Sequence, residues 1–198
     1  MRFGKWSIVA VAFATALAFG VVNAAADSPP VTRGDAQALF NAGTTGGFAI
    51  KLNAGVIAGA PASGGRILPG ANFQGVHICA SDWHVMAINL VVTDATDGVQ
   101  TVNEARAVFS TIAVSYQLDG SPLAIETSAV APWLGDPTSL DPNATVAFSQ
   151  HFGTILAPAD LSVGAHTERV RIYQNGVLVD DLGDVTFFVD AAGTGACL

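Results

Sequence analysis

Two histidines and an aspartate, His77, Asp82 and His84, are the side chains of this sequence best suited to chemistry. Imidazole and carboxylate groups ligate zinc or copper, and they also serve as acid and base in hydrolysis. The two histidines are seven positions apart, and this odd interval places them on opposite faces of a continuous strand. Only a turn between them can bring the three side chains together. One hypothesis is therefore a metal-binding protein or hydrolase that uses this cluster.

A structural interpretation of the same stretch competes with that hypothesis, and the sequence favours it. Asp82 then bonds backbone amides in a turn, Trp83 packs on the core and His84 opens a strand. His166 and Glu168 lie two apart on one strand face, where a hydrogen-bonded pair is commoner than an acid and base pair. The serine-hydrolase patterns Gly-x-Ser-x-Gly and Ser-x-x-Lys are missing from the sequence. We expect no cofactor.

The two cysteines, Cys79 and Cys197, are predicted to form an intramolecular disulfide. An exported chain meets an oxidising compartment, and an even cysteine count favours pairing. Their wide spacing excludes a Cys-x-x-Cys redox or zinc motif. Free thiols or intermolecular bridges are the alternatives. A bridge would hold the C-terminus against the body of the protein and would consume both candidate cysteine nucleophiles.

Trp133 is the residue most suggestive of recognition, because tryptophan is amphipathic and favours interfaces. It lies in a Pro- and Gly-rich loop over residues 131–144. The ring either contacts a partner or lies back over the end of the fold as a lid on the core. Trp83 is a second candidate binding residue.

The first 26 residues have the order of a secretory signal peptide. Arg2 and Lys5 precede the apolar run Ile8–Val22, and small residues up to Ala26 follow it. The run is shorter than the roughly 20 residues of a membrane-spanning helix. We therefore expect cleavage, no stable membrane anchor afterwards, and a secreted protein in the periplasm or outside the cell.

Composition excludes two classes of partner. The whole chain has a formal charge of −8, and cleavage after Ala26 leaves six basic against sixteen acidic side chains, or −10. Such a surface repels nucleic acid. Lys51 is the one lysine that remains, so a polybasic attraction to anionic membranes is excluded as well.

Alternating apolar residues and turn signals predict mainly strands. Residues 85–93 are apolar on both alternating faces, as in a strand buried in a core. Asp119-Gly120 and Asn175-Gly176 predict two hairpin turns, the first followed by a return strand from Leu123 to about Val130. Thr101 and Glu104 form a capping-box pattern that begins one short helix over about 102–112. The other predicted strands cover about 48–52, 76–80, 112–118, 146–152, 169–173 and 185–189.

These elements predict an all-β protein, an antiparallel β-sandwich with one short helix. We expect three segments: the signal peptide over 1–26, a Gly/Ala/Pro-rich segment with at least one strand over 27–75, and the sandwich body over 76–198. Residues 27–198 together have the length of one domain.

The final segment, about 161–190, resembles the last two strands of bacterial immunoglobulin-like domains. The resemblance lies in a Leu-x-x-Gly-x-His entry and a Val-x-Phe-x-Val strand, here Leu161, Gly164, His166, Val185, Phe187 and Val189. The chain also resembles small exported bacterial proteins without an assigned activity. The resemblance implies an immunoglobulin-like sandwich and carries over no functional residues.

The sequence thus predicts an exported, non-catalytic β-sandwich that binds a protein or glycan, or serves structurally in the envelope or outside the cell. The ligand and the oligomeric state stay open. The alternative is the metal-binding or hydrolytic protein based on His77, Asp82 and His84.

Overall fold

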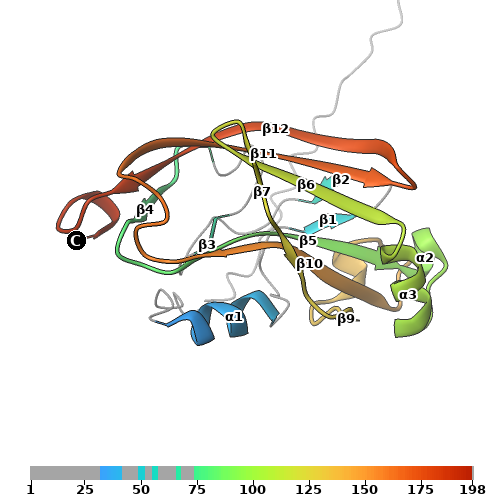
Figure 1. Cartoon of the computed structure of the whole chain (residues 1–198). Helices are drawn as coiled ribbons and strands as arrows, with labels where there is room; N and C mark the ends of the chain where they lie inside the picture. Colours follow the sequence, from blue (N-terminus) through green and yellow to red (C-terminus); the bar gives the residue numbers. More distant parts are fainter. Residues whose placement is uncertain (1–31, 42–48, 52–54, 58–65, 68–73, 198) are drawn as a thin grey trace, which may run out of the picture.

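The computed structural model places two β-sheets face to face (Figure 1). It describes residues 32–41, 49–51, 55–57, 66–67 and 74–197, so the predicted signal peptide lies outside the described residues. The β-sandwich predicted from the strand pattern is confirmed. Within the described part of the chain, no helix has the length and apolar character to cross a membrane.

The first sheet, sheet A, is built on β5 (His84–Thr93) and β10 (Ala147–Leu156). These two strands pair antiparallel over their whole length, from His84 opposite Leu156 to Thr93 opposite Ala147. Five short strands complete the sheet: β1 (Ala49–Lys51), β2 (Gly55–Ile57), β3 (Arg66–Ile67), β8 (Glu126–Thr127) and β9 (Ala131–Pro132).

The second sheet, sheet B, has the strand order β4-β12-β11-β6-β7. Two hairpins form most of it, and both predicted turns are confirmed. Asp119, Gly120, Asn175 and Gly176 all have positive φ, the conformation that a type I′ turn requires at its two central positions. The strands are β4 (His77–Cys79), β6 (Ile112–Leu118), β7 (Ser121–Leu123), β11 (Gly164–Gln174) and β12 (Val177–Asp190).

The core fills the space between the sheets with alternate residues of the long strands. From β5 come Met86, Ile88, Leu90 and Val92, and from sheet B come Val170, Ile172, Val185, Phe187 and Val189. A hydrogen bond also crosses this layer, since the Tyr116 hydroxyl donates to the carbonyl of Phe152 at 3.1 Å. The sandwich is therefore held mainly by apolar burial between its sheets, to which this hydrogen bond adds a polar link.

The outer face of sheet A is covered as well. Helix α1 (Arg33–Asn41) packs Ala36 and Phe40 on Val85 and Ala87 of β5, below the sheet in Figure 1. Trp133 and Leu140 pack further along, on Val91 and Ala147. All ten residues of β5 are consequently buried, as the apolar pattern on both of its faces predicted.

The remaining helices lie at the ends of the sandwich. The predicted capping box is present at α3 (Val102–Phe109), where Thr101 accepts from the Glu104 amide and Glu104 accepts from the Thr101 amide. The others are α2 (Asp94–Asp97) and two 3₁₀ turns, η2 (Pro137–Ser139) and η3 (Gly195–Cys197).

Three details differ from the sequence-based expectation. The sandwich is not purely antiparallel, because β4 pairs parallel with β12, and β1 and β3 pair parallel with β5. Helix α1 was not predicted, although the apolar outer face of β5 requires a cover. The return strand after Gly120 ends at Leu123, since the chain then leaves sheet B and joins β10 of sheet A as β8.

One core position carries a carboxyl group. Glu168 of β11 is 1% exposed, and neither of its oxygens has a hydrogen-bond partner. Burial raises the pKa of this carboxyl from 4.5 to about 8. The folded protein therefore holds a proton on Glu168 at neutral pH that the unfolded chain releases.

We expect this proton to make the protein less stable as pH rises. Between about pH 4.5 and 8 the folded state binds more protons at Glu168 than the unfolded state does, so the free energy of unfolding falls by about 3 to 5 kcal/mol in total. In Glu168→Gln this contribution vanishes, and the pH dependence flattens. Urea unfolding at several pH values measures it.

Glu126→Gln, at an exposed position, is the matched control and should follow the wild type. The pKa of His166 is also raised, so a smaller loss of stability above its ordinary pKa of 6.5 remains in every variant. An unchanged pH dependence in Glu168→Gln would show that the carboxyl is not buried as described.

Candidate ligand-binding site

The structure separates the two histidines that the sequence singled out. His77 lies on β4 of sheet B and His84 opens β5 of sheet A, because the chain changes sheet at the turn between them. His77 Nδ1 contacts Asp190 Oδ1 at 3.0 Å, and its ring stacks on Phe188. The turn does not direct the two imidazoles at a common point.

His84 and Asp82 have separate local partners. His84 is buried and donates from Nε2 to the carbonyl of Cys79 at 2.7 Å, so its Nδ1 carries the lone pair in the neutral ring. Asp82 accepts from the Ser81 hydroxyl at 3.3 Å. Among the described residues, no group of three His, Cys, Asp or Glu side chains can hold a metal ion. The His77, Asp82 and His84 site stays a prediction.

A disulfide joins Cys79 to Cys197 and holds the C-terminus against β4. Asp190 reinforces this attachment, because its carboxylate accepts from the Ala196 amide at 2.7 Å and contacts His77. The disulfide and these Asp190 contacts together are called the C-terminal clip. The Ala196 amide, and then His77, lower the pKa of Asp190. Gly195 leaves room for this contact, since a Cβ there would lie within bonding distance of the Asp190 carboxylate.

The two tryptophans of the sandwich lie over the outer face of sheet A. Trp83 packs against the cluster formed by α1 and β5. Trp133 packs on Val91 and Ala147, and its indole nitrogen is buried without a hydrogen-bond partner. The ring lies so close to Gly135 that a Cβ there would meet the indole nitrogen at 2.6 Å. Whether Trp133 also contacts a partner stays a prediction.

The outer face of sheet B differs from that of sheet A, because no described helix or strand covers it (Figure 1). Along β11 the side chains alternate strictly, with Glu168, Val170 and Ile172 buried and Arg169 and Arg171 partly exposed. The register places Gln117 of β6 on one side of Arg169 and Asp184 of β12 on the other. A band of polar side chains thus crosses the sheet.

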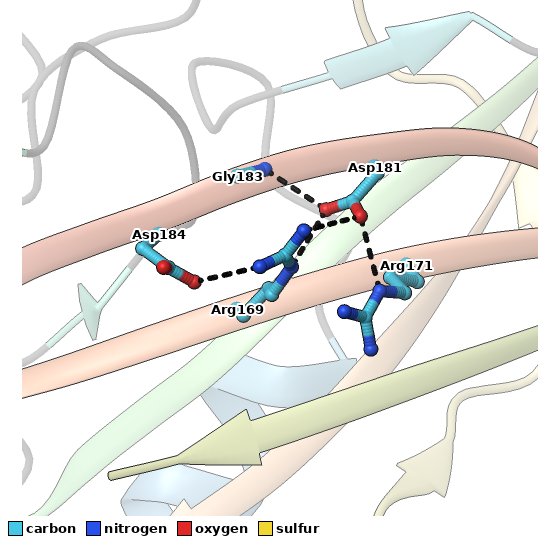
Figure 2. Close-up of polar contacts among 5 residues, drawn as sticks. All are labelled: Arg169, Arg171, Asp181, Gly183 and Asp184. Carbon is cyan, nitrogen blue, oxygen red and sulfur yellow. Dashed lines mark hydrogen bonds and ion pairs between the residues drawn. The ribbon is translucent and has the colours of Figure 1, made fainter. Parts of the chain in front are cut away.

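Four of these side chains form an arginine–aspartate network, shown in Figure 2. Arg169 donates to both oxygens of Asp181, from Nε at 3.0 Å and from Nη2 at 2.7 Å, and to Asp184 Oδ1 from Nη1 at 3.3 Å. Arg171 Nε donates to Asp181 Oδ2 at 3.0 Å. The two-bond fork between Arg169 and Asp181 fixes both groups in one orientation.

The network shifts the pKa values of Asp181 and Arg169 away from neutral pH. The Arg169 hydrogen bond, followed by that of Arg171, holds the pKa of Asp181 far below its usual range, although desolvation opposes them. The Asp181 hydrogen bond in turn raises the pKa of Arg169. Two positive and two negative groups therefore stand together near neutral pH, and their charges sum to zero.

A β-bulge in β12 makes the network possible. Asp181 and Asp184 are three residues apart and would alternate to opposite faces of a regular strand. Between Arg169 and Arg171, however, β12 advances by three residues, from Asp184 to Asp181. Gly183 supplies the extra residue with φ +73° and donates its amide to Asp181 Oδ1. Both carboxylates consequently reach the outer face.

Beside the network the surface is hollowed to about 250 Å³. Five residues line this hollow: Gln117, Gly120, Thr167, Arg169 and Asp184. Within the described structure, neither the Gln117 amide nor the Thr167 hydroxyl hydrogen-bonds to another group. The hollow therefore combines fixed charges with donors and acceptors that remain available to a ligand.

The sequence-based predictions do not include this site. The signal was the concentration of charge: Arg169 and Arg171 are two of the six basic residues after Ala26, and they stand opposite an acidic strand. A regular ladder from the Asn175-Gly176 turn would nevertheless pair Arg169 with Leu182.

No protein-family model matches the chain, and no curated protein matches it either. Among solved structures, the C-terminal domain of the Streptococcus agalactiae AgI/II polypeptide BspA is similar with a TM-score of 0.34 and 9% identity, over 60% of this chain and 46% of that one. A second structure, BspA_C_WT, gives 0.32 and 10%, over 60% and 45%. This chain thus spans under half the length of those structures. At such TM-scores the similarity says nothing of function.

We expect the disulfide to be a major part of the stability of the protein. It closes a loop across a sequence separation of 118, for which chain entropy gives about 4 to 5 kcal/mol. The variant Cys79→Ser/Cys197→Ser should lose that amount in urea unfolding. Wild type treated with reductant should match the variant. A loss below about 1 kcal/mol would show that the clip holds without the covalent bond.

We expect Gly183→Ala to disturb the network through the backbone alone. A Cβ at this position meets nothing within 4 Å, but the positive φ costs an alanine about 1 to 2 kcal/mol. The variant should lose that stability in urea unfolding, and Gly183→Asn should lose less, because asparagine tolerates positive φ. Equal losses in the two variants would contradict this account of the bulge.

Proposed function

We propose that this protein is an exported, non-catalytic binding module whose ligand docks on the outer face of sheet B. One observation carries the proposal. Sheet A is covered on both faces, whereas sheet B presents to solvent a network of fixed charges beside a hollow with unused hydrogen-bonding groups. Side chains that are already locked lose little conformational entropy when a ligand binds them.

Export is part of the proposal. The Arg2 to Ala26 pattern supports a cleaved leader, and the Cys79–Cys197 disulfide suits an oxidising compartment such as the periplasm or the extracellular space. The finer assignment of the sandwich as immunoglobulin-like rests on the pattern of its last two strands and belongs to this proposal as well.

The electrostatics of the site favour binding over catalysis. A general acid or base requires a pKa near the working pH. On this face the ion pairs move pKa values away from neutral pH, because they lower the pKa of Asp181 and raise that of Arg169. Asp181 and Arg169 therefore hold a fixed shape and charge pattern, and neither is suited to proton transfer at neutral pH.

We expect the protein to be retained by its ligand in its own surroundings, and the outer face of sheet B to be responsible. Oxidised protein from the exported fraction of its host is mixed with the host's cell-envelope fraction, and the sedimented share is measured. Arg169→Ala/Arg171→Ala should reduce retention at least about tenfold, the effect of losing charged hydrogen bonds.

The matched control is Arg33→Ala/Arg106→Ala. It removes the same two charges from exposed positions on α1 and α3, so it has the same net charge as the test variant. Its retention should equal that of the wild type. Equal retention of both double variants, or no retention of the wild type, would overturn the proposal.

A further inference from the structure

We infer that the ligand of this face is a neutral carbohydrate, with one sugar ring seated in the hollow lined by Gln117, Thr167, Arg169 and Asp184. The inference rests on the proposed function and names the chemistry of its ligand. Three properties of the hollow lead to it: its charge balance, its hydrogen-bonding groups and its size.

The charge balance selects a neutral ligand. The two guanidinium groups of the network are offset by two carboxylates, so the site offers no net attraction to an anion or to a cation. The chain after Ala26, network included, has sixteen acidic against six basic residues and repels anions at long range. A phosphate, a nucleic acid or an acidic polysaccharide therefore fits this surface poorly.

The hydrogen-bonding groups suit a polyhydroxylated ligand. Each hydroxyl of a sugar both donates and accepts, and neighbouring hydroxyls present such pairs side by side. The hollow provides an amide at Gln117 and a hydroxyl at Thr167, and both groups can donate and accept hydrogen bonds. Asp184 adds a carboxylate whose side chain is 61% exposed and uses Oδ1 for Arg169. Donors and acceptors thus alternate around one small space.

The size of the hollow limits what it can hold. At about 250 Å³ it lies below the roughly 300 to 1,000 Å³ of pockets for drug-sized ligands. Four of its five lining residues have polar side chains and none has a large apolar one, so it offers no deep apolar anchor site for a peptide side chain. A single sugar ring, free or at the end of a glycan, matches both the volume and the lining.

The direct experiment presents the oxidised protein to immobilised neutral oligosaccharides built from glucose, galactose, mannose or N-acetylglucosamine, with uronic-acid and sialylated oligosaccharides beside them. We expect binding to at least one neutral class and weaker binding to the acidic ones. Because the ligand carries no charge, affinity should change less than about twofold between roughly 50 and 500 mM NaCl.

Gln117→Ala tests the hollow itself, since the Gln117 amide makes no hydrogen bond within the described structure. It should bind about three- to tenfold more weakly, the cost of one lost hydrogen-bonding group. The matched control is Gln100→Ala, at an exposed position before α3, which should bind like the wild type. Binding to acidic oligosaccharides alone, strong salt dependence, no binding, or equal affinity of Gln117→Ala and wild type would each overturn the inference.

Treating the envelope fraction separates failure of this inference from failure of the proposed function. Periodate cleaves vicinal diols of sugars, so it should abolish the retention that depends on Arg169 and Arg171, whereas protease should leave it. Retention that survives periodate and is lost to protease would identify a protein ligand, which sinks the carbohydrate inference and keeps the binding face. Retention that is indifferent to Arg169 and Arg171 would sink both.

Discussion

The burial of both faces of β5 is the constraint on which the rest of the structure depends. All ten of its residues are inaccessible, and a strand that is apolar on two sides needs two covers. Sheet B supplies the inner cover. Helix α1 and the segment around Trp133 supply the outer one. Because these segments cover the outer face of sheet A, sheet B has one buried face and one open face. The arginine–aspartate network lies on that open face.

Strand β11 shows how sharply the two faces of sheet B differ. Its inner face carries His166 and Glu168 ahead of Val170, so even the polar residues there are buried. His166 is satisfied, because it donates to the Ser162 carbonyl and contacts Asp119, both at 2.7 Å. Glu168 has no such partner and stays protonated. The outer face of the same strand holds Arg169 and Arg171 in ion pairs with aspartates of β12. The partly exposed arginines thus keep their charges, because solvent and ion pairs stabilise them, whereas the buried Glu168 carboxyl is protonated.

Local sequence signals predicted the elements well where one interaction decides the outcome. The Thr101 and Glu104 capping box and the Asn175-Gly176 turn are such cases, and so is the double-sided apolar pattern of β5. The pairing of segments that lie far apart in the sequence was not predicted. Nothing in residues 121–127 shows that the chain leaves sheet B for sheet A, because both sheets accept the same alternation. The site was missed for a related reason, because every irregularity along a hairpin changes the pairing of all residues beyond it. Two one-residue register shifts in β12 together move the partner of Arg169 by two positions.

Those shifts also explain why this hairpin carries a site where a regular one would not. In a regular ladder Leu182 would stand opposite Arg169, and the guanidinium would be left to water. With Gly183 as the extra residue, Arg169 hydrogen-bonds to Asp181 and Asp184 together, which offsets its positive charge and fixes its plane. A rigid guanidinium whose positive charge is offset by two carboxylates differs from a solvated surface arginine in the ligands it favours. Together with the unused amide and hydroxyl groups beside it, it favours a ligand that matches fixed directions of hydrogen bonding and gives no advantage to a charged one. The bulge is therefore the feature that turns an ordinary open sheet face into a surface able to discriminate.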